Sequence, residues 1–309
     1  SVSENKVVNK FNFYKKQYKE IKKYLNIVVE NNIIYVADNI GYLYAFDYKK
    51  NEILWAKNYK VPFRSNIKIS NNKLISANLN NDLLFLNKVN GELLATIPTE
   101  ETIIKNKFIN NISITNQYIL YLNTYGTLYA IDSASLNIRW FLNLNQSLDL
   151  NPSNLFSGNQ IINHNDKIVI SSNDFTYILD EKTGSIIHKK NFSSSLKPVV
   201  IDKYLFLISK RNLLIATDIT NGKIIYSHNI NNRIAEFIKT NKKKVKLKNI
   251  MLADDKIFIF LKNSYVVKFN IKGNIEEINK LPSKINSNPI FINSSMLFLD
   301  YRNKLVIVD

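Results

Sequence analysis

The sequence of 309 residues has no cysteine, only seven glycines and six prolines, and no run of eighteen apolar residues. The absence of cysteine excludes disulfides, thiolate metal sites and a cysteine nucleophile. Without a long apolar run, the sequence predicts no membrane-spanning helix. Hydrophobic residues make up 45% of the chain, which is enough for a sizeable core.

Acidic residues are also scarce, with 25 Asp and Glu against 42 Lys and Arg, a net charge of +17. Such an excess indicates an anionic partner, such as nucleic acid, lipid head groups or an acidic protein. The alternative is composition drift, because Lys, Asn and Ile share AT-rich codons. Scattered lysines favour the second interpretation, except at residues 242–248. The chain begins at Ser1 and shows no signal peptide, so we expect a processed or trimmed product whose compartment stays open.

One phrase occurs twice, as "IGYLYAFDYKKNEILWAKN" at residues 40–58 and "YGTLYAIDSASLNIRWFLN" at residues 125–143. The shared positions include Gly41, Asp47, Trp55 and their counterparts Gly126, Asp132, Trp140. Alignment on the Asp or Asn that ends the "YAFD" segment extends the repeat to seven copies with a mean spacing of about 44 residues. The copies end at Asp47, Asn87, Asp132, Asp180, Asp218, Asn270 and Asp309.

Each copy contains short β-branched and aromatic runs separated by turn residues. In the first copy these runs are residues 26–30, 32–38, 43–47 and 52–59. Six of the seven glycines fall between such runs, where hairpin turns often need a positive φ. The repeating unit is therefore expected to be four antiparallel strands.

Seven such units predict an all-β fold, a seven-bladed β-propeller of four-stranded antiparallel blades that forms a single domain over residues 1–309. The absence of a 3.6-residue period excludes a helical solenoid, and two β-sandwiches would not explain the regular repeat. The seventh copy ends at Asp309, after its third strand. We therefore expect the segment "KVVNKFNFY", residues 6–14, to pair as the outer strand of blade seven and close the ring.

The phrase G-x-L-Y-A-[FI]-D-x-x-x-x-x-[IL]-x-W resembles the repeat of quinoprotein dehydrogenases and their non-enzymatic relatives with pyrroloquinoline-quinone-like (PQQ-like) repeats. The family's repeat Trp packs between blades, and it is replaced in other copies by Ala95, His188, Tyr226 and Ile278. In size and topology the chain is most similar to the lipoprotein B subunits of the outer-membrane β-barrel assembly machine (BamB). A lipid-bearing cysteine would precede Ser1 in such a protein, and no lipid anchor is visible in this chain.

The resemblance implies a non-catalytic scaffold of the bacterial envelope that supports insertion of β-barrel proteins into the outer membrane. It implies a periplasmic, outer-membrane-associated monomer within a larger complex, with the barrel-insertion protein as partner. One alternative is another PQQ-like-repeat interaction module, periplasmic or tethered to the inner membrane. Another is a small-molecule binder or quinoprotein-type enzyme that uses the central channel.

Enzymes of the quinoprotein family have eight blades, a calcium site and a catalytic Asp. This sequence has seven repeats and no acidic cluster with calcium-binding spacing. Its histidines, His164, His188 and His228, do not pair at metal-binding spacing, and no G-x-S-x-G motif occurs. We therefore predict no enzyme, no catalytic or metal-binding residues and no cofactor.

Two connections exceed the basic repeat, and exposed loops commonly carry function. The first, residues 143–159, combines apolar and acidic side chains and resembles in position a long loop with which the family's subunit docks on the barrel-insertion protein. Local burial of its apolar residues is the alternative. The candidate partner-binding residues here are Leu148, Asp149, Leu150, Leu155 and Phe156.

The second connection, residues 231–249, carries a cluster of lysines. They predict an electrostatic contact with an acidic protein face or an anionic lipid surface, and a solvated insertion is the alternative. The absence of aromatic residues between the lysines disfavours nucleic acid. The candidate residues are Lys242, Lys243, Lys244, Lys246 and Lys248.

Overall fold

The protein is described by a computed structural model that divides into two compact units, residues 1–157 and 158–309. No helix in the described part of either unit is long and apolar enough to cross a membrane. The described residues are 10–14, 18, 20–101, 109–145, 156, 158–172, 174–241, 244–292 and 295–308.

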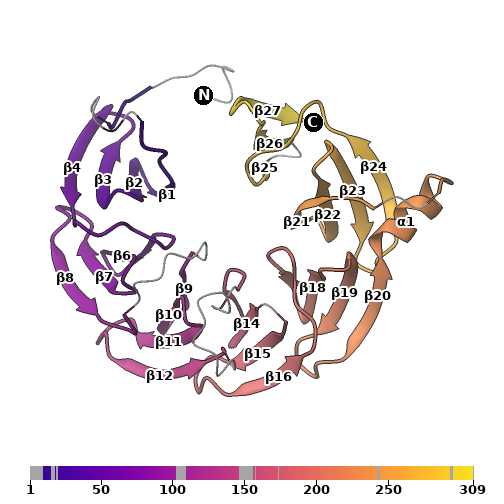
Figure 1. Cartoon of the computed structure of the whole chain (residues 1–309), viewed down its shortest axis with the longest axis horizontal. Helices are drawn as coiled ribbons and strands as arrows, with labels where there is room; N and C mark the ends of the chain where they lie inside the picture. Colours follow the sequence, from indigo (N-terminus) through magenta and orange to yellow (C-terminus); the bar gives the residue numbers. More distant parts are fainter. Residues whose placement is uncertain are drawn as a thin grey trace. The chain divides into compact units, whose positions relative to one another are not determined.

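The first unit contains three antiparallel sheets, here called blades 1 to 3, whose strands pair in chain order (Figure 1). Blade 1 consists of β1 (Leu25–Glu30), β2 (Ile33–Asp38), β3 (Tyr42–Asp47) and β4 (Glu52–Asn58). Blade 2 consists of β5 (Lys68–Ser70), β6 (Lys73–Ala77), β7 (Leu83–Asn87) and β8 (Leu93–Ile97). Blade 3 consists of β9 (Asn111–Ile114), β10 (Tyr118–Leu122), β11 (Thr127–Asp132) and β12 (Ile138–Asn143).

The second unit contains blades 4 to 7 and a short helix, α1 (Ile230–Phe237), between blades 5 and 6. Blade 4 consists of β13 (Ile162–His164), β14 (Lys167–Ser171), β15 (Thr176–Asp180) and β16 (Ile186–Lys190). Blade 5 consists of β17 (Val199–Ile201), β18 (Tyr204–Ile208), β19 (Leu213–Asp218) and β20 (Ile224–Asn229). Blade 6 consists of β21 (Leu247–Ala253), β22 (Lys256–Leu261), β23 (Tyr265–Asn270) and β24 (Ile275–Lys280), and blade 7 of β25 (Ile290–Ile292), β26 (Ser295–Leu299) and β27 (Leu305–Val308).

These seven sheets confirm the predicted fold class, an all-β seven-bladed propeller. Six blades are four-stranded, and blade 7 has three strands among the described residues. The core lies between blades: one cluster joins Leu43 of blade 1 to Leu74 of blade 2, and another joins Leu214 of blade 5 to Ile259 of blade 6. The second and third strands are therefore covered on both faces, which explains their continuous apolar sequences.

The third and fourth strands of a blade are paired through a β-bulge that recurs at the same place in blades 1 to 6. In blade 1, Ala45 pairs with Trp55 and Phe46 with Ile53, so Leu54 is the extra residue. A bulge bends its strand and redirects neighbouring side chains. The bulge thus immediately precedes the position occupied by the motif tryptophan.

The side chain at this motif position lies against the turn between the third and fourth strands of the next blade. Trp55 Nε1 donates a hydrogen bond to Lys88 O (3.1 Å), and Tyr226 OH donates to Ile271 O (3.0 Å). A Cβ on Gly91, where φ is +70°, would lie 2.7 Å from the Trp55 ring. Glycine suits position 91 because it adopts a positive φ without strain and because it leaves room for the Trp55 ring.

At the contact between blades 2 and 3 the strand residue is small and the turn residue is large, the reverse of Trp55 and Gly91. The motif position of blade 2 is Ala95, and the turn position of blade 3 that corresponds to Gly91 is Leu136, with a φ of 58°. Both residues pack against the hydrophobic cluster shared by blades 2 and 3. A larger turn residue thus accompanies the smaller strand residue, as close packing requires.

The described part of the N-terminal segment, residues 10–14, contains no strand and packs on blade 1. Phe11 and Phe13 lie 4.9 and 5.4 Å from Phe46 between ring centroids, and Tyr14 OH donates to Asp38 Oδ2 at 2.9 Å. Desolvation, reinforced by Asp38, raises the pKa of Tyr14 far above its ordinary value, so the phenol stays a donor. Residues 10–14 therefore do not form the outer strand expected from the sequence, and this part of the expectation is wrong. Residues 6–9 lie outside the described residues, so their pairing with blade 7 stays a prediction, as does the single-domain organisation.

The contact between blades 1 and 2 should respond to exchange of its two partners. We expect Gly91→Leu to lower the free energy of unfolding by about 2–3 kcal/mol, because the new side chain enters the space of Trp55. The double variant W55A/G91L reproduces the combination of Ala95 and Leu136. Its free energy of unfolding should fall by about 1 kcal/mol or more less than the sum of the losses in the two single variants. Urea unfolding of the four proteins of this cycle measures the coupling; additive single effects would contradict the account.

Truncation tests the N-terminal contacts. Deleting residues 1–14 should lower the melting temperature by several degrees, because Phe11, Phe13 and Tyr14 are lost, and Tyr14→Phe alone should cost about 1 kcal/mol. Deleting only residues 1–9 keeps these contacts. Any fall in melting temperature that this shorter deletion causes, relative to the full chain, therefore measures the predicted pairing with blade 7. A melting curve unchanged by the longer deletion would refute both contributions.

Candidate interaction surface

The connection between β12 and β13 contacts blade 3 at two points, Leu144 and Phe156. The Leu144 N–H donates to Gly126 O (2.8 Å), and the ring of Phe156 covers Gly126 so closely that a Cβ there would lie 2.5 Å from it. Phe156 is only 3% exposed, so for this candidate the structure favours local burial, the alternative stated from the sequence, and a partner contact stays a prediction. The other candidates, Leu148, Asp149, Leu150 and Leu155, lie outside the described residues.

The second connection contains α1, a helix that the sequence interpretation missed. Its N-cap is Asn229, whose Oδ1 accepts a hydrogen bond from the Asn232 N–H at 3.2 Å. Ile230 and Ile234 follow at the spacing of one helix face and pack on the core shared by blades 5 and 6. The Asn cap followed by isoleucines four residues apart was the available signal.

The chain after α1 is held against the helix start and against blade 6. The buried Asn231 accepts a hydrogen bond from the Val245 N–H through Oδ1 at 3.0 Å, and Asn212 Nδ2 donates to Val245 O at 3.0 Å. The Lys262 N–H donates to Lys246 O at 2.8 Å. These bonds satisfy buried polar groups and fix the return of the chain into β21.

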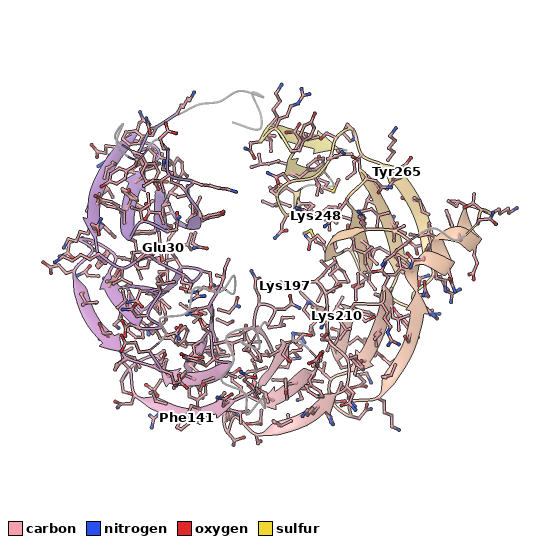
Figure 2. All side chains as sticks on the ribbon, viewed as in Figure 1. Glu30, Phe141, Lys197, Lys210, Lys248 and Tyr265 are labelled. Carbon is pink, nitrogen blue, oxygen red and sulfur yellow. The ribbon has the colours of Figure 1, made fainter. Side chains whose placement is uncertain are left out.

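The lysine candidates divide between this return segment and β21. Lys244 and Lys246 are exposed on the return segment, while Lys248 is half-buried on β21, on the same blade as Tyr265 (Figure 2). Lys242 and Lys243 lie outside the described residues. The structure therefore places two of the five candidates on one exposed stretch.

His228 lies where β20 meets α1. Its ring stacks on Tyr226 with a centroid distance of 4.7 Å, and Arg233 Nη2 lies 3.3 Å from both ring nitrogens. Desolvation and the Arg233 charge lower the pKa of His228 below its ordinary value. The imidazole is thus kept neutral beside the guanidinium.

Side chains with catalytic potential are engaged in structural hydrogen bonds. Asp47 Oδ1 accepts the Lys49 and Lys50 N–H groups at 2.9 Å, which stabilises the turn. At Asp132, the Ser135 N–H and Arg139 hold the pKa of the carboxyl well below its usual range. Within the described residues, no group of three or more His, Asp or Glu side chains could hold a metal ion.

Among the residues that the structure describes, Glu100 is the carboxylate that accepts hydrogen bonds from the most side chains. Burial alone would raise its pKa, but hydrogen bonds from Thr127 Oγ1 (2.6 Å), Tyr129 OH (2.6 Å) and Asn123 reverse this and lower it. All three donors come from β11 or the turn that precedes it. The carboxylate therefore ties the end of blade 2 to blade 3.

Protonation of His228 should weaken folding. A base whose pKa is depressed in the folded state contributes stability above its unfolded pKa, about 6.5, that is lost as the pH falls below that value. We expect the urea midpoint of the wild type to fall between pH 7.5 and pH 5, and H228Q to show a smaller fall. An identical pH dependence of both proteins would contradict this role of the Arg233 contact.

Comparison with known proteins gives the family. A search of curated protein sequences returned no match. Among solved structures, BamB from Moraxella catarrhalis superposes with a TM-score of 0.73 at 14% identity, covering 92% of this chain and 83% of that one. The computationally designed Ika8 protein superposes with a TM-score of 0.69 at 10% identity, covering 92% and 82%. These identities establish the shared propeller fold alone.

The sequence profile of one protein family matches residues 16–228, more than half of the chain. The matched region runs from the N-terminal segment to the end of blade 5 and includes both complete copies of the Gly, Asp and Trp motif. Matched and unmatched regions therefore meet next to α1, which begins at residue 230. The chain belongs to the family of the outer membrane protein assembly factor BamB.

Proposed function

We propose that the protein is a non-catalytic scaffold of the bacterial envelope that supports the assembly of β-barrel proteins in the outer membrane. The observation that carries this proposal is the family match over residues 16–228, together with the propeller fold of the whole chain. A propeller of this family serves protein–protein interaction within a complex. The finer assignments, to the periplasm and to the outer membrane, rest on the family relationship.

The architecture suits this task because the blades hold their connections in fixed positions. The β12–β13 connection is attached through Leu144 and Phe156, and the β20–β21 connection through Asn231 and Val245. Segments with fixed ends lose less conformational freedom when a partner binds. Such a scaffold can orient a flexible partner without chemistry of its own.

The proposed partner is the barrel-insertion protein, and the proposed contact is the β12–β13 connection. Its residues Leu148, Asp149 and Leu150 lie in the stretch between the two attachment points, Leu144 and Phe156. Apolar side chains flanking an acid fit a partner surface that combines an apolar hollow with a basic group. In this proposal the protein acts as a monomer within the larger complex.

The absence of catalysis in this proposal is supported by how the polar residues are used. Asp47, Asp132 and Glu100 accept hydrogen bonds from neighbouring turns and strands. His188 Nε2 lies 3.2 Å from Thr220 O, so this ring takes the same position between blades as Trp55. These groups are consistent with structural roles.

A binding assay with purified components tests the proposal. The periplasmic domains of the barrel-insertion protein from the same organism are immobilised, and binding of the full chain is measured by surface plasmon resonance. We expect specific binding that L148E/L150E weakens at least about tenfold, since charges replace the proposed apolar contacts.

The matched control is L93E/L94E, which changes two adjacent, half-exposed leucines of β8 outside the connection. It should bind like the wild type. If the wild type fails to bind, or if it recovers only inner-membrane or cytoplasmic proteins from envelope extract, the proposed role in barrel assembly is wrong. Equal weakening by both variants would place the contact elsewhere.

A further inference from the structure

A groove of about 810 Å³ separates α1 and its return segment from the end of blade 6. On one side it is lined by Ile234, Phe237 and Ile238, and on the other by Leu261, Tyr265 and Ile278. Its lining is therefore mainly apolar, and its volume lies in the range of ligand-binding pockets.

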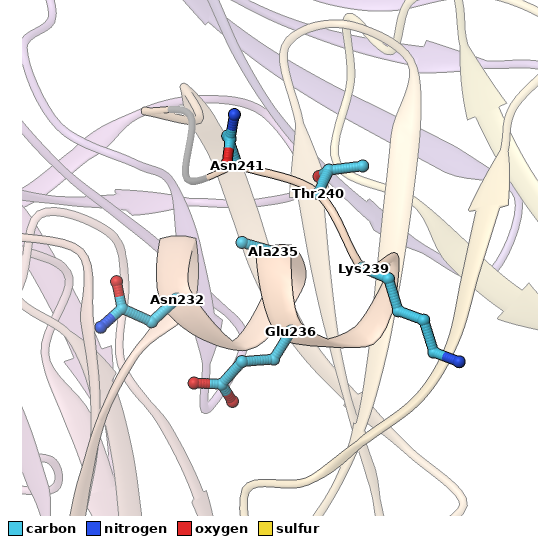
Figure 3. Close-up of a pocket in the computed structure, with 6 residues that line it drawn as sticks. All are labelled: Asn232, Ala235, Glu236, Lys239, Thr240 and Asn241. Atoms are coloured by element: carbon cyan, nitrogen blue, oxygen red, sulfur yellow. The ribbon is translucent and has the colours of Figure 1, made fainter.

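The apolar face of α1 is only partly covered by the protein itself. Ile230 is fully buried and Ile234 half-buried, but Phe237 and Ile238 at the end of the helix are 46% and 48% exposed. Asn232 and Glu236 are exposed and line a neighbouring pocket together with Ala235, Thr240 and Asn241 (Figure 3). Two large apolar side chains thus remain open to the groove, where burial by a partner is favourable.

The charges around the groove are of one sign. Its lining includes Lys244, Lys246, Lys262 and Lys284, all exposed, and no Asp or Glu. Among the residues that the structure describes, none of these lysines is in an ion pair. The nearby Glu236 lines the neighbouring pocket and not the groove, and its Oε2 lies 3.7 Å from Arg233 Nη1. The rim is therefore electrostatically complementary to an acidic ligand.

We propose that this groove binds a segment of a partner protein that carries both acidic and apolar side chains. The apolar side chains would cover Phe237 and Ile238, and the carboxylates would meet Lys244 and Lys246. A concave site with an apolar floor favours a peptide over a lipid surface, since a flat bilayer reaches the rim lysines but not the floor.

The walls of the groove are formed before binding. Asn231 bonds to the Val245 backbone, and Lys246 O accepts the Lys262 N–H, so the helix and the return segment are attached to blades 5 and 6. A preformed site binds at lower entropic cost. The groove goes beyond the proposed function, because α1 begins at residue 230, after the family match ends at residue 228.

Fluorescence anisotropy tests the proposal with the full chain and labelled synthetic probes. The main probe is a 14-residue peptide with Glu at its polar positions and Leu and Phe at i, i+3, i+4 and i+7. The second replaces Leu and Phe by Ser, and the third replaces Glu by Lys. We expect only the first to bind, with an affinity that falls as salt increases.

Two variants and their matched controls locate the site. F237S/I238S and K244E/K246E should each weaken binding of the first peptide at least about tenfold. The controls are I224S/I225S, which changes side chains of 51% and 50% exposure on β20, and K223E/K272E, which reverses two exposed turn lysines. Both controls should bind like the wild type, and circular dichroism checks that all variants fold.

The proposal is overturned if the first and second peptides bind equally, or if the controls weaken binding as much as the groove variants. It is also overturned if phosphatidylglycerol vesicles bind the chain and compete away the peptide while F237S/I238S has no effect, since the site would then be a lipid-facing surface. None of these results depends on the barrel-insertion protein, so they are separable from a failure of the proposed function.

Discussion

The structure depends on one repeated contact, in which a fourth-strand side chain packs on the turn of the following blade. Blades of a propeller bury their faces only against their neighbours, so this contact sets how closely successive blades approach. Trp55 against Gly91 is the fullest example. Between blades 2 and 3 the strand residue is the smaller Ala95, and the turn residue is the larger Leu136, which also has a positive φ. The larger turn residue thus occupies space that a large strand side chain fills between blades 1 and 2, as close packing requires.

The repeat made most of the fold predictable, because turn residues and apolar runs alternate at regular spacing. The first expected strand, residues 26–30, differs from β1 (Leu25–Glu30) by one residue. Helix α1 was missed because it has only eight residues and its few apolar side chains lie in an otherwise polar connection. The sequence left open whether Phe156 is buried, because its burial depends on contact with Gly126 in another part of the chain. The groove was missed because its lining residues are distant from one another in sequence: Lys262 and Lys284 belong to two different connections.

We propose that function in this chain lies where the repeat is interrupted. Within a blade, carboxylates such as Asp47 stabilise turns by accepting hydrogen bonds from backbone N–H groups. The β12–β13 and β20–β21 connections differ, because their ends are fixed while their central parts add side chains that the repeat does not use. The first connection lies inside the family match, whereas α1 begins after it ends.

In the proposed division of roles, the blades provide support and the two connections bind partners. Hydrogen–deuterium exchange of the full chain, with and without the periplasmic domains of the barrel-insertion protein, tests this division. The account predicts protection concentrated in residues 143–159, with residues 230–248 unchanged until an acidic apolar peptide is added. Protection spread over the strands of the blades, with both connections unaffected, would contradict it.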